Sequence, residues 1–143
     1  MAEPTKKFWD DVTEGEALPQ VRMHVPYAKV ILNAAATNDY FPGHHDPEYA
    51  RAQGQRNIYF NTMAIEGFID RVATNWAGPH AFLRKRQMQM RASIYAEDTM
   101  YGDGVVRKRY QEDGRNLVEL EIKIATDEGV RVPAVVTLEL PRR

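Results

Sequence analysis

The clearest structural signal in this chain is the run Asn61-Thr62-Met63-Ala64-Ile65-Glu66-Gly67-Phe68-Ile69-Asp70-Arg71-Val72-Ala73-Thr74-Asn75-Trp76. Its apolar residues recur at i, i+3, i+4, i+7, i+8 and i+11, which is the period of an amphipathic α-helix. Asn61 or Thr62 can cap its start, and Gly78-Pro79 predicts its end. Gly67 costs about 1 kcal/mol relative to alanine inside a helix. We therefore expect another backbone or a ligand to approach the helix at Gly67.

Strand patterns dominate the sequence that follows this helix. Apolar residues alternate with polar ones over 87–94 and predict a long strand, with Met88 and Met90 in the core. Further strands are predicted over 105–110, 118–124 and 132–140. Two turns separate these strands, Glu112-Asp113-Gly114-Arg115 and Asp127-Glu128-Gly129. Hairpins join antiparallel strands, so the sequence predicts an α+β fold in which an antiparallel sheet carries the helix on one face.

Upstream of the long helix the pattern is less regular. Residues 20–25 alternate as a half-buried strand does, and the alanine-rich residues 27–37 predict a short helix entered through Pro26. Asp46-Pro47 opens another short helix, which should end near Gly54. The two short helices flank a loop of polar and turn-forming residues.

Asp39 and His44 in that loop are the candidate catalytic residues. Pro42 and Gly43 break any helix arriving from the alanines, and a turn through them can bring the two side chains to one point. A carboxylate and an imidazole that meet in this way can hold and polarise one water. The alternative is that Asp39 caps a turn and that His44 is an exposed loop residue.

Composition limits the classes of function. With 143 residues, of which 43% are hydrophobic, the chain predicts a single domain over 1–143. The net charge of −1 argues against a general nucleic-acid binder, and the lack of cysteine excludes disulfides and thiolate chemistry. Met1 to Lys7 is polar, and no segment reaches the ~20 apolar residues of a membrane span, so we expect a soluble, cytoplasmic protein. His24, His45 and His80 suggest no metal-ligand spacing, and we expect no metal site.

The layout and the loop together resemble the MaoC-like, or hydratase-2, branch of the hot-dog fold. In that family a curved antiparallel sheet wraps one long central helix. Its motif pairs an Asp with a His five residues on, then an Asp and an Ala, and here Asp39, His44, Asp46 and Ala50 fill those places, with Pro42 at the proline position. The resemblance spans nearly the whole chain and implies a hot-dog domain.

Three positions depart from the family pattern. The family usually has Gly before the Asp, Asn two residues after it, and His-Gly just before the long helix; this chain has Asn38, Phe41 and Phe60-Asn61. Residues 61–63 and 75–79 carry a closer likeness, to the small single-hot-dog subunits that act in actinobacterial steroid side-chain degradation. Those subunits resemble halves of a two-subunit hydratase.

The resemblance implies an acyl-CoA hydratase that adds water across the double bond of a 2-enoyl thioester, with a bulky steroid side-chain acyl group as one candidate substrate. Asp39 and His44 would supply the base and the acid, with their order left open. Backbone amides at Asn61, Thr62 and Met63 would hold the thioester oxygen, with Gly67 beside the substrate. Arg84, Lys85 or Arg86 would bind CoA phosphates, as could Arg107 or Lys108. Coenzyme A enters as part of the substrate, and no cofactor is expected.

Two other functions stay open at the level of sequence. A non-catalytic hot-dog subunit would bind acyl-CoA or scaffold a complex without turnover, which Phe41 and the missing His-Gly would permit. A hot-dog thioesterase would release free CoA. In every case we expect a homodimer, or a heterodimer with a second MaoC-like chain, because a single hot-dog sheet leaves an open edge.

Overall fold

The computed structural model describes residues 6–143, so most of the polar segment Met1 to Lys7 lies outside the described residues. The first half of the chain forms η1 (Trp9–Asp11), β1 (Val21–His24), α1 (Tyr27–Ala36), η2 (Pro42–His44), α2 (Pro47–Ala52) and α3 (Thr62–Ala77). The second half forms β2 (Phe82–Met88), β3 (Thr99–Glu112), β4 (Arg115–Thr126) and β5 (Gly129–Glu139). The predicted helices and the hairpin-linked strands are therefore confirmed, most of them to within a few residues.

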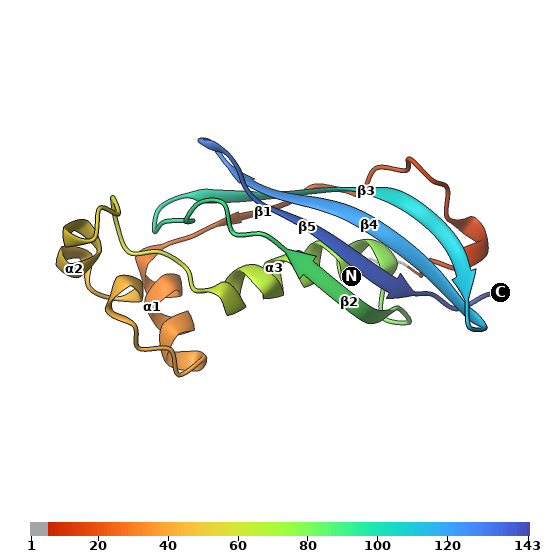
Figure 1. The fold of residues 1–143 in the computed structure, drawn as a ribbon, viewed down its shortest axis with the longest axis horizontal. Coiled ribbons are helices and arrows are strands. Elements are labelled where there is room, and N and C mark those ends of the chain that lie inside the picture. Colours follow the sequence, from red (N-terminus) through yellow and green to blue (C-terminus); the bar gives the residue numbers. More distant parts are fainter. Residues whose placement is uncertain (1–5) are drawn as a thin grey trace.

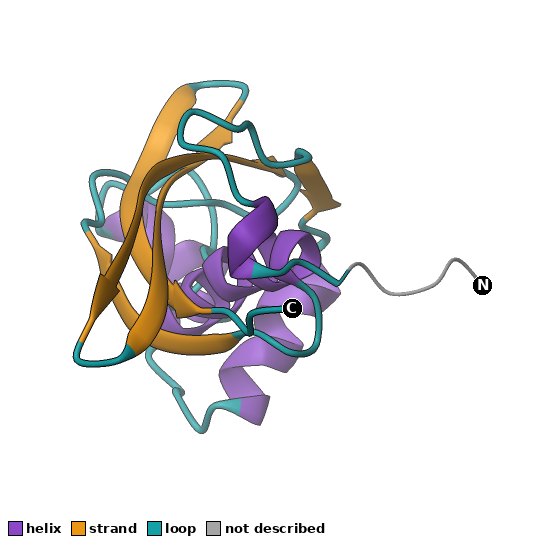
Figure 2. Cartoon of the chain, turned by 90° about the vertical axis from the view of Figure 1, so that its right-hand side faces the viewer, coloured by secondary structure: helices purple, strands orange, loops and turns teal. Residues whose placement is uncertain are grey.

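The five strands form one antiparallel sheet in the order β1-β3-β4-β5-β2. Asp113 and Gly114, at φ 49° and 75°, make the tight turn between β3 and β4, because a two-residue hairpin of this type needs left-handed backbone at both positions. The Asp127-Glu128 turn joins β4 to β5, where Thr126 pairs with Gly129. The sheet runs lengthwise over α3 (Figure 1) and curls around it (Figure 2).

The core lies between the inner face of the sheet and α3. The helix buries the predicted apolar face: Ile65, Phe68, Ile69, Val72, Ala73, Trp76 and Ala77. Gly102 of β3 lets the helix come close, since a Cβ atom there would overlap Val72 and lie 3.1 Å from Phe68. The predicted α+β arrangement, a curved antiparallel sheet around one long helix, is confirmed.

The predicted strand over 87–94 is wrong in its placement. The strand is β2, which begins at Phe82 and ends at Met88, opposite Ala134 of β5. The next residue of β5 is Pro133, which has no N–H to donate, so only its carbonyl is used, by Gln89 N at 3.0 Å. The regular register ends at Met88, beyond which Arg91 N still donates to the carbonyl of Arg131 at 3.0 Å. Met90, expected in the core, is 42% exposed.

The segment α1–η2–α2 lies beyond one end of the sheet, at the left in Figure 1, and the C-terminus lies at the other end. Val30 of α1 and Ala50 of α2 bury their side chains in the main core cluster, which fixes this segment to the sheet and α3. In residues 6–143, no helix has both the length and the apolar character needed to cross a lipid bilayer.

Glu16 joins the N-terminal segment to α3 near the end of the sheet where the C-terminus lies. Its Oε1 accepts hydrogen bonds from Lys7 Nζ at 2.5 Å and from Trp76 Nε1 at 3.0 Å. Burial alone would raise the pKa of Glu16, but these bonds outweigh burial and hold the pKa below its ordinary value of 4.5. The carboxylate therefore contributes stability that is present above about pH 4.5 and is lost as the pH falls through the lower pKa of the folded state.

We expect Glu16→Gln to remove part of this acid sensitivity. The difference between the melting temperatures at pH 7 and pH 3 should be smaller in the variant than in the unmodified protein, because glutamine cannot be protonated there. Glu48→Gln, which changes an exposed carboxylate outside this contact, serves as the control. An equal acid response in both variants would contradict this role of Glu16.

Candidate active site

Asp39 and His44 meet at one point of the α1–η2–α2 segment. His44 Nε2 lies 3.4 Å from Asp39 Oδ2. The His44 side chain is 9% exposed, while the Asp39 side chain is 29% exposed, so the pair is set into the surface and one carboxylate remains open to solvent. A water or a substrate can reach the pair from the side of Asp39.

Local backbone structure builds this meeting point. After α1 the chain turns through Asn38, which has φ 54°, and the N–H of Asp39 returns to the carbonyl of Ala34 at 2.9 Å. The 3₁₀ turn η2 then carries His44 back toward Asp39. Asp46 accepts hydrogen bonds from the N–H groups of Glu48 and Tyr49 and so caps α2. The Asp46-Pro47 helix start expected from the sequence is thereby confirmed.

The tautomer of His44 follows from a backbone carbonyl. His44 Nδ1 lies 2.7 Å from the carbonyl oxygen of Tyr59, which can only accept, so Nδ1 carries the proton and donates. In the neutral ring Nε2 is then unprotonated and faces Asp39. The unprotonated Nε2 of His44 and the carboxylate of Asp39 can thus both contact one small molecule.

Asn61 holds the carboxylate from the other side. Its Nδ2 donates to Asp39 Oδ2 at 3.1 Å and to Thr37 Oγ1 at 2.8 Å. Its Oδ1 accepts from Asn33 Nδ2 at 2.6 Å and from the N–H of Ala64 at 3.0 Å. Every hydrogen-bonding position of this buried amide is used, and one residue both caps α3 and orients Asp39.

Sequence reasoning identifies Asn61 as a helix cap and as a source of a backbone amide, but it misses the contact with Asp39. It misses Asn33, Thr37 and Tyr59 as well. Asn33 and Thr37 lie four residues apart near the end of a mostly apolar helix, and this spacing on one face could have identified them. Tyr59 acts through its backbone carbonyl, for which no side-chain pattern exists.

Aromatic rings enclose the His44 imidazole. The centroid of its ring lies 5.5 Å from that of Phe41 and 5.1 Å from that of Tyr59, both edge to face. Burial, with smaller effects from Tyr49 and Tyr95, raises the pKa of Tyr59, so its phenol stays uncharged near neutral pH. These rings restrict the imidazole to the orientation that faces Asp39.

Gly43 is the residue that leaves room for the two rings. A Cβ atom there would lie 2.7 Å from Phe41 Cε1 and 2.7 Å from the Tyr59 hydroxyl oxygen. We expect Gly43→Ala to displace both rings and to lower kcat by about 10-fold, since small errors in position are costly to catalysis. Steady-state kinetics and thermal unfolding measure the two effects, and an unchanged kcat would contradict this role.

Comparisons with known proteins agree with the geometry of the Asp39–His44 site. No family model matches the sequence. The chain is 33% identical over 92 residues to the 3-oxo-4,17-pregnadiene-20-carboxyl-CoA hydratase beta subunit of Mycobacterium tuberculosis (strain ATCC 25618 / H37Rv), an alignment that covers 64% of this chain and 71% of the relative. This chain belongs to the MaoC-like hydratase family of hot-dog proteins.

Solved structures agree with this membership. A chain of the ChsH1-ChsH2 complex from Mycobacterium tuberculosis matches with a TM-score of 0.82 at 30% identity, over 90% of this chain and 98% of that one. A MaoC-like dehydratase from Rhodospirillum rubrum shares the fold, with a TM-score of 0.84 at 17% identity, over 96% and 98% of the two chains. The predicted hot-dog fold and the predicted likeness to a subunit of a two-subunit hydratase are confirmed.

Two departures from the MaoC-like motif have a structural explanation. Asn38 stands where the family usually has glycine, and its φ of 54° is a left-handed conformation that asparagine tolerates better than most residues. Phe41 stands where the family usually has asparagine, and here the amide that contacts Asp39 comes from Asn61 instead. An amide contact with Asp39 is therefore supplied from the start of α3.

The other candidate substrate-binding residues lie along the start and the outer face of α3. Thr62 and Met63 occupy its first turn, where N–H groups have no acceptor within the helix and the dipole is positive. Both residues are exposed, and the contact between Asn61 and Asp39 places this turn beside Asp39 and His44. Their role in holding a thioester oxygen stays a prediction.

Gly67 lies on the outer face of α3, and a Cβ atom there would meet nothing within 4 Å. Gly67→Ala should therefore raise the free energy of unfolding of the isolated chain by about 1 kcal/mol. If another backbone or a ligand does approach this residue, as the sequence predicts, the same variant should bind acyl-CoA or its partner chain more weakly. Denaturant unfolding and a binding titration measure the two effects. Unchanged binding would contradict the predicted approach.

The candidate CoA-phosphate residues lie on β2, and two of them already have acidic partners. Arg84 pairs with Glu139, and Arg86 pairs with Asp70 at 2.5 Å and Glu66 at 3.0 Å. Lys85 is exposed and lines a groove on the outer face of the sheet. Of the other cations considered, Arg107 lies 3.4 Å from Glu119, and Lys108 lies over the ring of Tyr110. Phosphate binding by any of them stays a prediction.

The remaining histidines lie outside the pair. His45 Nε2 lies 3.0 Å from the carbonyl oxygen of Tyr40, His24 lies 3.5 Å from Glu97 at the surface, and His80 is exposed. Across residues 6–143, no three acidic, histidine or cysteine side chains gather closely enough to hold a metal ion.

Proposed function

We propose that this chain is the catalytic subunit of a hydratase that adds water across the double bond of a 2-enoyl-CoA thioester. The observation that carries the proposal is the 3.4 Å approach of His44 Nε2 to Asp39 Oδ2, with both groups held by neighbours that fix their orientation. A subunit without chemistry would have little need for such a supported pair.

Asp39 and His44 together can carry both proton transfers of water addition. A water hydrogen-bonded to both His44 Nε2 and Asp39 from the open side of the pair can lose a proton to the pair as its oxygen attacks C3 of the enoyl group, and the pair can return a proton to C2. Because Asp39 and His44 are in contact, they would act on one face of the double bond, so addition should be syn. Because the two groups are in contact, we treat them as one coupled acid–base unit.

The developing charge on the thioester oxygen needs donors in the same place. The N–H groups of Thr62 and Met63 at the start of α3 are suited to this, because they lack helical acceptors and sit at the positive end of the helix dipole. Asn61 fixes the start of that helix relative to Asp39 through its own side chain. One residue therefore sets the distance between the acid–base pair and the oxygen site.

The substrate and the partner are proposed from the relatives. One relative is named as a hydratase of a pregnadiene carboxyl-CoA, and one similar structure is a complex of ChsH1 with ChsH2. We propose a bulky acyl group for this chain and a second hot-dog chain that completes its pocket. β1 and β2 lie at the two edges of the sheet, where a partner strand could pair. The cytoplasmic location expected from the sequence stays a prediction.

The test is an assay of purified protein, alone and with its partner chain, on short-chain and steroid-like 2-enoyl-CoA substrates. The expected result is a product heavier by one water, detected by mass spectrometry, without release of free thiol. Binding of acyl-CoA without turnover would favour the non-catalytic subunit. Release of CoA, detected with a thiol reagent, would favour a thioesterase. Either result would overturn the proposal.

A further inference from the structure

The orientation of His44 depends on one carbonyl in a segment without regular secondary structure. Residues 58–60 lie between the catalytic loop and residues 94–96. On one side the N–H of Tyr59 donates to the carbonyl of Gly43 at 3.2 Å. On the other side the N–H of Phe60 donates to the carbonyl of Ile94 at 3.0 Å, and Ala96 N–H donates to the Ile58 carbonyl at 2.9 Å. The position of the Tyr59 carbonyl therefore depends on where 94–96 is held.

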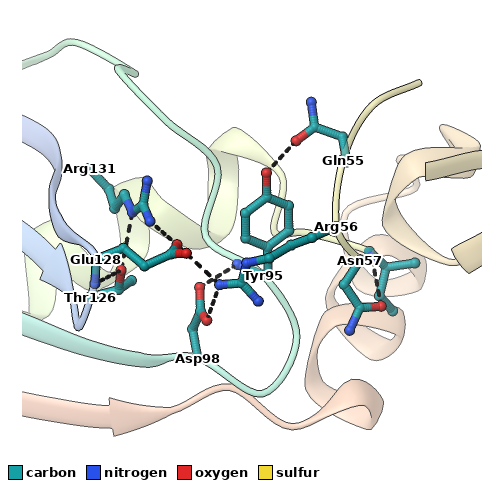
Figure 3. A network of polar contacts seen from close by, with 9 residues as sticks. Gln55, Arg56, Asn57, Tyr95, Asp98, Thr126, Glu128 and Arg131 are labelled. Carbon is teal, nitrogen blue, oxygen red and sulfur yellow. Dashed lines mark hydrogen bonds and ion pairs between the residues drawn. The ribbon is translucent and has the colours of Figure 1, made fainter. Parts of the chain in front are cut away.

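A polar network holds both segments against the β4–β5 hairpin (Figure 3). Arg56 is at its centre, with Nη2 2.5 Å from Asp98 Oδ1 and 3.2 Å from Glu128 Oε2. Its guanidinium also lies over the ring of Tyr95, 4.2 Å from the centroid. One side chain thus joins the segment before Tyr59, the segment of residues 95–98 and the hairpin.

The partners of Arg56 are themselves fixed. Asp98 Oδ2 accepts from the N–H of Tyr95 at 2.9 Å, and the Tyr95 hydroxyl donates to Gln55 Oε1 at 2.6 Å. Arg131 binds Glu128 and also donates to Thr126 Oγ1 at 3.1 Å. Burial by itself would lower the pKa of Arg56, but the contacts with Asp98 and Glu128 raise it overall, so the guanidinium remains charged.

We propose that Arg56 is a positioning residue of the hydratase site, which sets the place of the Tyr59 carbonyl and through it the tautomer and orientation of His44. The inference rests on the proposed function for its catalytic consequence, and on the hydrogen bond between His44 Nδ1 and Tyr59 for its structural one. Arg56 touches neither Asp39 nor His44 in the network, and it acts through backbone that connects the hairpin to the catalytic loop.

Arg56→Met is the main test, because methionine keeps an unbranched apolar stem and removes the fork of donors. We expect kcat to fall by about 10-fold while KM changes by less than about twofold, since the substrate-binding surface is untouched and the error is one of geometry. Arg56→Lys keeps the charge without the planar fork and should recover part of the lost kcat.

A spectroscopic measurement separates positioning from a general loss of stability. In ¹⁵N spectra of the whole chain, neutral His44 should show a protonated Nδ1 and an unprotonated Nε2. Arg56→Met should mix the two tautomers. Arg142→Met is the matched control, because Arg142 also pairs with a carboxylate, that of Asp10, and lies near an aromatic ring, that of Trp9, at the other end of the molecule. It should change neither kcat nor the His44 signals.

The outcomes are distinct. If Arg56→Met and Arg142→Met behave alike in both measurements, the inference is overturned. If Arg56→Met does not fold, Arg56→Lys decides in the same way: mixed tautomers and reduced kcat support positioning, and values equal to those of the unmodified protein refute it. If the unmodified protein hydrates no enoyl-CoA, the proposed function fails, while the His44 spectra still decide whether Arg56 controls the imidazole.

Discussion

His44→Ala is expected to lower kcat for water addition by about 10²- to 10⁴-fold, because it removes the imidazole that takes or returns a proton. Asp39→Asn should lower kcat by at least about 10²-fold, because the amide keeps the shape of the carboxylate and loses its basicity. Product formation from a 2-enoyl-CoA, followed under saturating substrate, measures both.

His45→Ala is the matched control for these two variants. His45 adjoins His44 in the chain, is exposed, and has its ring directed at the carbonyl of Tyr40. It should retain the rate of the unmodified protein. Full activity in both Asp39→Asn and His44→Ala would show that the pair is not the acid–base unit. Equal losses in all three variants would indicate damage to the loop instead of lost chemistry.

Asn61→Asp should separate the two functions of the Asn61 amide. Aspartate can still accept from the N–H of Ala64 and so keep the cap of α3. It replaces the donor that now lies 3.1 Å from Asp39 Oδ2 by a second acidic oxygen, and two carboxylates at that distance cannot both stay ionised. We expect kcat to fall by about 10²-fold, as for the loss of the acid–base pair.

Asn61→Ala should add a loss of stability to the loss of rate, of about 1–2 kcal/mol for the missing cap. Denaturant unfolding measures this change, and Asn75→Ala, on the exposed face of the same helix, is the control. If Asn61→Asp turns over as fast as the unmodified protein, Asn61 is a helix cap and nothing more.

The elements that sequence predicted best are those whose pattern is local. The period of 3.6 over the long helix and the turn chemistry at Asp113-Gly114 each suffice within a few residues, and both are confirmed. The strand predicted over 87–94 instead runs from Phe82 to Met88, and Pro133 of its partner strand bears only on its end. The residues of β5 determine which residues of the 82–94 segment join the sheet. The sequence of that segment alone does not contain this information.

The meeting of Asp39 and His44 was predictable, and most of its surroundings were not. Asp39 and His44 are joined by a short loop, so their spacing and the turn residues between them predict that the two side chains meet. Asn61 reaches Asp39 across 22 positions, and Tyr59 contributes a backbone carbonyl. The sequence also could not show which cations are free to bind phosphate. Arg84 pairs with Glu139 and Arg86 pairs with Asp70, and no local pattern indicates these partners.

The two contacts of the Asn61 side chain, with Asp39 and with the start of α3, restrict how the thermal stability of this protein can be raised. Helix caps are usually favourable positions for raising heat resistance, because improving them seldom disturbs activity. In this chain the first turn of the longest helix is capped by the same Asn61 side chain that donates to the Asp39 carboxylate. Laboratory evolution toward higher temperature should therefore leave position 61 unchanged, and a homologue that differs there should be found to have rebuilt both the cap and the acid–base pair.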